Sequence, residues 1–127
     1  MEATIKSIRP FIGAKNIDVS RAFYKDFGFE EVVLAPNLFY FRSTHFGFYL
    51  QDAYVKDWVD NTMLFLEVEN LEHHLKGTKA LGLDKKYPGV RISEVHYKDW
   101  GKEYFVHDPS GILWHIGEFH KWLIIKK

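Results

Sequence analysis

The sequence contains no cysteine and no long apolar run, and each absence excludes a class of protein. Without cysteine there are no disulfides, no thiolate nucleophile and no thiolate-ligated zinc. The longest candidate segment, residues 122–125, is far shorter than the roughly 20 residues that span a bilayer. The first residues also lack the charged-then-apolar layout of a signal peptide. We therefore expect no membrane association and a cytoplasmic location.

A net charge is also lacking, because 17 Lys and Arg balance 17 Asp and Glu. A balanced chain has no overall field that would attract nucleic acid or an anionic membrane, so neither partner is expected. What is present is ample core material, since 46% of the residues are hydrophobic and 17% are aromatic. A chain of 127 residues with this composition predicts one domain.

An internal repeat is the most informative pattern in the chain. At an offset of 54 residues, Asn16 and Gly28 recur as Asn70 and Gly82. In each copy an apolar run precedes the Asn, and a helix-compatible segment leads to the Gly. Asn at a helix start accepts hydrogen bonds from free N–H groups, and Gly supplies the left-handed turn that ends a helix. The pattern predicts a duplicated strand-helix unit.

The repeat continues past the helices with a longer offset, because Gly47 and Gly111 are 64 residues apart and each opens a strand-like run. The second copy must then contain an insertion, which we place around residues 84–91. This segment combines charge with a Pro-Gly turn signal and has no apolar period, so we expect a surface loop.

Hydrophobic periodicity predicts the same order of elements twice, strand, helix and three strands. In the first copy these elements are residues 5–14, 18–27, 31–34, 38–41 and 47–51. In the second copy they are residues 63–68, 71–81, 92–97, 103–107 and 113–118. Residues 52–60 between the copies read as a linker or a short helical turn. The expected division is a single domain, 1–127, with module one at 5–52, a linker at 53–61, module two at 62–119 and a C-terminal extension at 120–127.

Three local motifs accompany this order. They are the Ser-x-x-Phe-Tyr-x-x-x-Gly-Phe helix of Ser20, Phe23, Tyr24, Gly28 and Phe29, the stretch 100–103 (Trp-Gly-Lys-Glu), and the Asp108-Pro109-x-Gly111 hairpin turn. Together they resemble the glyoxalase, bleomycin-resistance and extradiol-dioxygenase superfamily, which has the vicinal oxygen chelate fold. The resemblance implies an α+β fold in which two βαβββ modules form a curved, barrel-like mixed sheet with helices outside. It also implies a homodimer, with the modules paired within or across chains.

The same resemblance implies four positions where metal-dependent members carry His, Glu or Gln. In this sequence they are Arg9, Gln51, Met63 and His115. Arg has only donors and a permanent charge, and a thioether is a poor ligand for hard or borderline divalent ions. The site pattern is therefore closest to the bleomycin-resistance branch, whose members lack the metal ligands and sequester a drug without chemistry. We expect no cofactor and identify no catalytic residue. The alternative is a divalent metal ion on Gln51 and His115 in a lyase, isomerase or dioxygenase.

Strand alternation places aromatic and polar side chains on one face of each module. The expected ligand-binding residues are Arg9, Phe11, Phe41, Tyr49, Gln51, Met63, Phe65, Trp100 and His115. Aromatic rings with a few polar anchors are typical of small-molecule pockets. A guanidinium at a former metal position could bind an anionic group. The sequence thus favours a protein that sequesters a planar or anionic ligand, such as an antibiotic, in a cavity within one chain or at a dimer boundary. An interaction module whose cavity is filled by its own side chains is a third reading.

Overall fold

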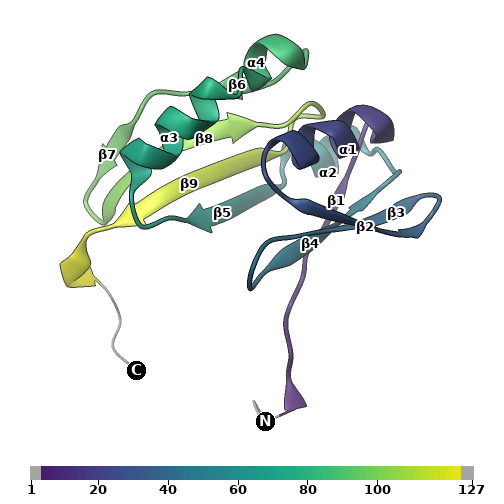
Figure 1. The fold of residues 1–127 in the computed structure, drawn as a ribbon, viewed down its shortest axis with the longest axis horizontal. Coiled ribbons are helices and arrows are strands. Elements are labelled where there is room, and N and C mark those ends of the chain that lie inside the picture. The colour runs from purple at the N-terminus through teal and green to yellow at the C-terminus, as the bar shows by residue number, and fades with distance from the viewer. Residues whose placement is uncertain (1–3, 124–127) are drawn as a thin grey trace.

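The computed structural model describes residues 4–123, and module one occupies its first half (Figure 1). Its elements are β1 (Phe11–Gly13), α1 (Ile17–Asp26), β2 (Glu30–Ala35), β3 (Leu38–Arg42) and β4 (Gly47–Gln51). The strands form one sheet in the order β1-β4-β3-β2, in which β1 runs parallel to β4 and the other pairs are antiparallel. A five-residue helix, α2 (Lys56–Asp60), leads to the second module.

Module two forms a second sheet of its own. Its elements are β5 (Met63–Glu67), α3 (Leu71–Ala80), α4 (Leu83–Lys86), β6 (Arg91–Ile92), β7 (His96–Lys98), β8 (Gly101–His107) and β9 (Leu113–Phe119), followed by the 3-10 turn η2 (Lys121–Leu123). The order is β5-β9-β8-β6, and β7 also pairs with β8. Strands β6 and β7 are two pieces of the strand predicted at 92–97. A one-residue register shift between them is a β-bulge.

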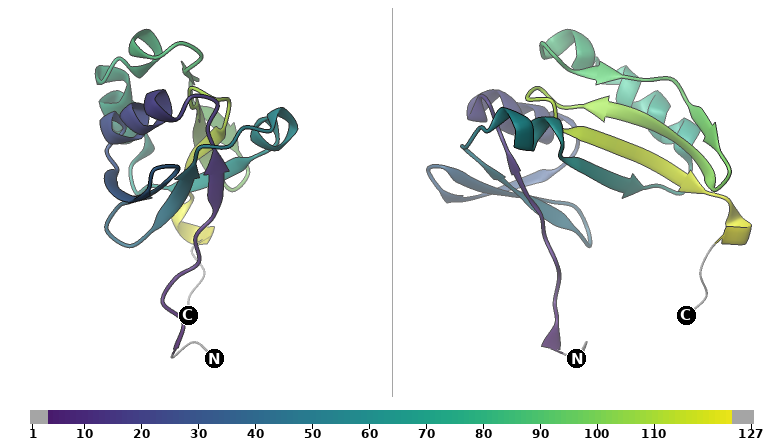
Figure 2. Two further views of the ribbon diagram at one scale, coloured as in Figure 1. Left: turned by 90° about the vertical axis from the view of Figure 1, so that its right-hand side faces the viewer. Right: turned by 180° about the vertical axis from the view of Figure 1, so that it is seen from behind.

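The predicted fold class is confirmed, with two βαβββ modules and helices on the outer side of both sheets (Figure 2). Within residues 4–123 the sheets stay separate and no barrel is closed. The repeat signals act as predicted. Asn16 accepts a hydrogen bond from the Val19 amide, and Asn70 accepts one from the His73 amide. Gly28 and Gly82 follow their helices with φ of +112° and +65°, in the region that favours glycine.

The first strand is shorter than predicted. Only residues 11–13 pair, whereas the preceding segment 5–10 is exposed and projects away from the body of the molecule (Figure 1). Along residues 4–123, β1 has β4 as its one partner strand, and Pro10 contributes a carbonyl but no N–H to that pairing. An apolar pattern alone could not reveal that no second strand lies beside this segment.

The insertion is not the loose surface loop that was expected. It contains α4, and Leu83, Tyr87 and Val90 are buried. The Tyr87 ring packs edge-on against Phe23 of α1 at a centroid distance of 5.7 Å, and its hydroxyl donates to Asp26. Three apolar side chains among charged neighbours were enough to attach this segment to α1, although they show no regular period.

The two modules share a core between their helix-covered faces. Trp114 of β9 packs against Tyr24, Phe29 and Phe48 of module one. The Trp114 indole N–H donates to the Tyr24 hydroxyl at 2.9 Å, and that hydroxyl donates to buried Asp108 at 2.7 Å. Val59 of α2 is buried, while Trp58 of the same helix and the preceding Val55 are exposed. No helix within residues 4–123 has the length and apolarity needed to cross a membrane.

Candidate ligand-binding site

Each sheet has a face that no helix covers. In Figure 2 the helices lie on one side of both sheets, and the uncovered faces turn toward the side on which segment 5–10 projects. Alternation along the strands decides which residues occupy these faces. In β4, Phe48 and Leu50 are buried under α1, so Tyr49 and Gln51 lie on the uncovered face. In β5, Met63, Phe65 and Glu67 lie on it.

The uncovered face of module one carries a cation among aromatic rings. The Arg9 guanidinium donates to the Tyr49 hydroxyl at 3.1 Å and lies 4.3 Å from the centre of the Tyr40 ring. Phe11 stacks on Tyr49 with ring centres 4.7 Å apart. The hydrogen bond to Tyr49 raises the pKa of Arg9, so this side chain stays cationic. Arg9 is thus positioned by two tyrosines while remaining exposed to a ligand.

The uncovered face of module two contains a hollow of about 580 Å³, lined by Met63, Leu64, Phe65, Trp100, Glu103, His115 and Phe119. Three of its rings are in mutual contact. The Trp100 and Phe119 ring centres are 4.9 Å apart, and Phe65 lies 5.8 Å from Trp100. A Cβ at Gly117 would lie 2.3 Å from the Phe65 ring, so glycine is what allows this ring to lie over β9.

A histidine-carboxylate pair forms the polar part of this hollow. His115 Nδ1 lies 2.9 Å from Glu103 Oε1, and His115 Nε2 lies 3.3 Å from Met63 Sδ. Glu103 is only 6% exposed, whereas Met63 is 62% exposed. The pair therefore runs from a buried carboxylate to the open side of the hollow.

The structure brings the predicted residues together in two groups rather than one. Met63, Phe65, Trp100 and His115 share the module-two hollow, which has no lining residue from module one. Arg9, Phe11 and Tyr49 form the cluster of module one. Gln51 lies on the same face, at the end of β4, opposite Gly13 of β1.

Phe41 does not belong to the site. It is fully buried on the opposite face of β3, against Tyr24 and Phe48, and it is a core residue. The neighbouring Tyr40 lies on the uncovered face instead, next to Arg9.

The sequence reasoning also left Glu103 and Phe119 out of the site. Glu103 could have been found from the pairing of β8 with β9, which places it beside Gly117 and on the face of His115.

The offset of 64 residues between Gly47 and Gly111 also matches Gln51 with His115, and this match is wrong by two residues. Phe11 pairs with Tyr49, and its repeat partner Phe65 pairs with His115. The true counterpart of His115 is thus Tyr49, at an offset of 66. A shift of two residues preserves the face of a strand, so the pattern alone could not expose the error.

The residues present do not fit a metal centre. Along residues 4–123, no three His, Asp or Glu side chains gather in a way that could hold an ion. The alternative ligands Gln51 and His115 belong to different sheets, and the second neighbour of His115 is a thioether. The expectation of no cofactor stays a prediction, but the donor set gives no support for metal chemistry.

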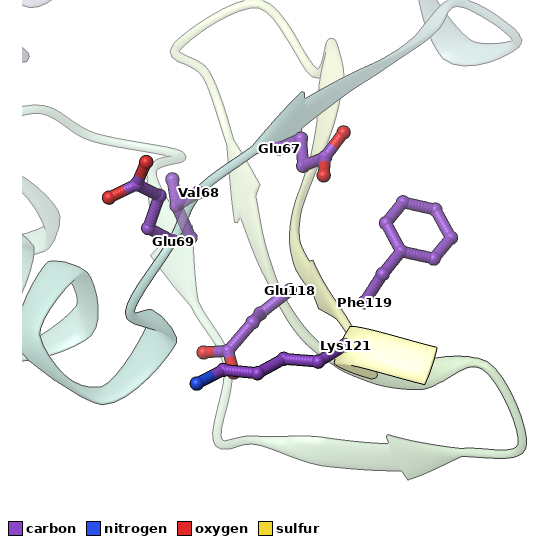
Figure 3. A pocket seen from close by; sticks show the side chains of 6 residues that line it. All are labelled: Glu67, Val68, Glu69, Glu118, Phe119 and Lys121. Atoms are coloured by element: carbon purple, nitrogen blue, oxygen red, sulfur yellow. The ribbon is translucent and has the colours of Figure 1, made fainter. Parts of the chain in front are cut away.

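A second hollow, of about 520 Å³, lies beside the ends of β5 and β9 and is lined by Glu67, Val68, Glu69, Glu118, Phe119 and Lys121. Figure 3 shows that the Glu67 and Glu69 carboxylates point away from each other. The Glu118 carboxylate accepts the Leu71 amide at the start of α3 at 2.8 Å, so it has a structural task. These carboxylates do not converge on a common ligand.

Comparison with known proteins shows which solved structures have a similar fold. No family model and no curated protein matches the sequence. Among solved structures, a bleomycin resistance determinant encoded on transposon Tn5 is 17% identical, with a TM-score of 0.77 over 91% of this chain and 99% of that one. The bleomycin-binding protein of Streptomyces verticillus, complexed with copper(II)-bleomycin, is 18% identical, with a TM-score of 0.74 over 92% and 100%. Lactoylglutathione lyase from Agrobacterium tumefaciens is 18% identical, with a TM-score of 0.69 over 95% and 99%.

Proposed function

Because the chain has the fold of the glyoxalase and bleomycin-resistance superfamily, we propose that it binds a planar or anionic small molecule and holds it without chemical change. The observation that carries this proposal is the set of side chains on the uncovered faces of the two sheets. They present clustered aromatic rings, with Arg9 and Met63 at two of the positions where the resemblance implies a metal ligand in metal-dependent members. Aromatic walls with few polar groups suit a planar ligand.

The position of Arg9 indicates that the ligand carries an anionic group. Its guanidinium is held by Tyr49 and Tyr40 and has no carboxylate partner among the ion pairs of residues 4–123. Another explanation of Arg9 would be a salt bridge to Glu67 or another carboxylate, but no such contact exists in the described part of the chain. A positioned cation without an internal counter-ion is well suited to a carboxylate, sulfonate or phosphate.

We propose further that a homodimer completes the cavity. Phe11, Met63 and Phe65 on the uncovered faces are 57%, 62% and 46% exposed, and the hollow beside them is open. β1 and β5 each pair with one strand only within residues 4–123, so two sheet edges are free. A second copy placed over these faces would enclose both the Arg9 cluster and the His115 hollow. We expect the protein to be located in the cytoplasm and to confer antibiotic resistance.

The test is to titrate the purified protein with bleomycin and with the planar anion 8-anilinonaphthalene-1-sulfonate, using calorimetry and fluorescence. Saturable binding that weakens about tenfold in Arg9→Met is expected, since one charge-assisted hydrogen bond is lost. Arg42→Met is the matched control, because Arg42 is bound to Glu30. If neither compound shows saturable binding, the proposal is contradicted.

The same preparation tests the rival enzyme. Metal analysis of protein purified without added ions is expected to show less than stoichiometric Ni, Zn, Fe or Mn. A stoichiometric metal that disappears in His115→Ala would establish a metal-dependent lyase, isomerase or dioxygenase instead, with His115 among its ligands.

A further inference from the structure

We propose that the module-two hollow recognises an acidic hydroxyl group, phenolic or enolic, on a planar ring, and that His115 Nε2 is the atom that binds it. This inference rests on the proposed ligand-binding function and narrows the class of ligand. It is carried by the His115-Glu103 pair and the thioether beside it.

Glu103 fixes the orientation of the imidazole. An ionised carboxylate can only accept hydrogen bonds, so the 2.9 Å contact requires a hydrogen on His115 Nδ1. The neutral ring then has its lone pair on Nε2. Glu103 is 6% exposed, and among the ion pairs of residues 4–123 it takes part only in the one with His115. A buried carboxylate paired with one imidazole holds that ring in place, as in other carboxylate-histidine pairs.

Nε2 has no suitable partner within the hollow. Its neighbour is Met63 Sδ at 3.3 Å, and a thioether has no hydrogen to donate and accepts only weakly. A ligand must therefore bring a donor to the neutral ring, or an anion if the ring carries a proton. An acidic hydroxyl satisfies both cases, because O–H donates to the lone pair and O⁻ accepts from N–H.

The rings around the pair favour a planar group. The His115 and Phe65 rings are nearly parallel, with 17° between their planes and centres 6.3 Å apart, and Trp100 and Phe119 lie beyond Phe65. A hollow of about 580 Å³ has room for a bicyclic aromatic compound. The hydroxyl at one end of such a compound would meet Nε2 while its ring contacts Phe65 or Trp100.

The test compares 7-hydroxycoumarin with 7-methoxycoumarin, which differ only in the hydroxyl hydrogen and its methyl replacement. Titration of the full chain, followed by fluorescence, is expected to show about tenfold tighter binding of the hydroxy compound, the effect of one good hydrogen bond. In His115→Phe, which keeps a ring, the two affinities are expected to become equal. In Glu103→Met, which removes the orienting carboxylate, the preference is expected to fall severalfold.

The matched control is His73→Phe on the exposed face of α3, where the tenfold preference is expected to remain. Equal affinities in the wild type, or a preference that survives His115→Phe, would overturn the inference. If 8-anilinonaphthalene-1-sulfonate binds but the hydroxycoumarin does not, the inference alone fails. If no compound binds, the proposed function fails with it. Melting curves identify any variant that is unfolded, and His115→Phe decides the matter if Glu103→Met does not fold.

Discussion

Residues at equivalent positions of the two modules carry different chemistry, so the proposed ligand would meet different groups on each module. Phe11 and Phe65 are equivalent and both supply a ring. Tyr49 and His115 are equivalent, but Tyr49 holds a cation whereas His115 is held by a buried carboxylate. Module one thus offers a positive charge, and module two offers an oriented imidazole. A ligand that contacts both must be polar in two distinct places.

Among single residues, His74 is expected to have the clearest effect on how stability depends on pH, and it lies outside the candidate site. Burial, and to a smaller extent the neighbouring His73, lower the pKa of His74 below its ordinary value of about 6.5. Its Nδ1 lies 2.6 Å from the Tyr104 hydroxyl, and burial raises the pKa of that hydroxyl to about 12. The folded state therefore favours a neutral His74.

The expected result is a free energy of unfolding that is greatest above pH 6.5 and falls as the pH drops through the lowered pKa of folded His74. The unfolded chain binds a proton in this range more readily than the folded chain, which gives that sign. Urea unfolding at a series of pH values measures it. His74→Gln is expected to flatten the slope, leaving the part due to His107, whose pKa is lowered by burial and by Arg91. An unchanged slope in His74→Gln would contradict this account.

At the scale of elements, the two long helices provide an internal comparison. Asn16 and Asn70 cap α1 and α3 in the same way, but α3 has an additional cap from Glu118, which accepts the Leu71 amide. Loss of an Asn cap costs about 1 kcal/mol. We expect Asn16→Ala and Asn70→Ala each to lower the free energy of unfolding by about this amount. Glu118→Gln is expected to lower it further, because it weakens the additional cap of α3, and α1 has no equivalent of this cap. Urea melts and helix signal in circular dichroism measure these changes, and a silent Asn16→Ala would refute the capping role.

The inserted segment provides a second test at this scale. If α4 is part of the core, Tyr87→Ala should cost about 3 kcal/mol because a large ring is removed from contact with Phe23. Tyr87→Phe should cost about 1 kcal/mol, since it loses only the hydrogen bond to Asp26. Denaturant unfolding separates these values. A change below about 0.5 kcal/mol in Tyr87→Ala would show that the segment is a loosely attached surface loop after all.

The elements also show what the sequence could and could not predict. Asn caps, glycine stops and strand alternation are local signals, so helix 18–27 and strand 47–51 match α1 and β4 closely. Contacts between distant segments are not local. The burial of Tyr87 depends on α1, and the lack of pairing at 5–10 depends on a missing neighbour. Among the candidate site residues, Arg9 and Met63 were implied by the family resemblance. Glu103 required the pairing of β8 with β9, and Phe41 was assigned to the wrong face.

At the scale of the whole molecule, several exposed apolar side chains lie on the projecting segment and on the uncovered sheet faces. Ile8 is 97% exposed in the projecting segment, and Phe11 and Met63 are more than half exposed on the uncovered faces. Exposed apolar side chains that gather on one side of a molecule are typical of protein interfaces. The proposed homodimer would bury these side chains on the side that carries the Arg9 cluster and the His115 hollow.

A substitution in the projecting segment distinguishes a dimer from a monomer. In a monomer, Ile8→Asp changes a fully exposed residue and is expected to leave both mass and stability unaltered. In the homodimer, it places a charge in the apolar boundary and should raise the dimer dissociation constant by tenfold or more. Sedimentation equilibrium at micromolar concentration measures the mass, and ligand titration should show weaker binding in parallel. Val33→Asp, an exposed strand residue away from the uncovered faces, is the control. A monomeric mass for the wild type, with the ligand bound tightly, would place the complete cavity within one chain.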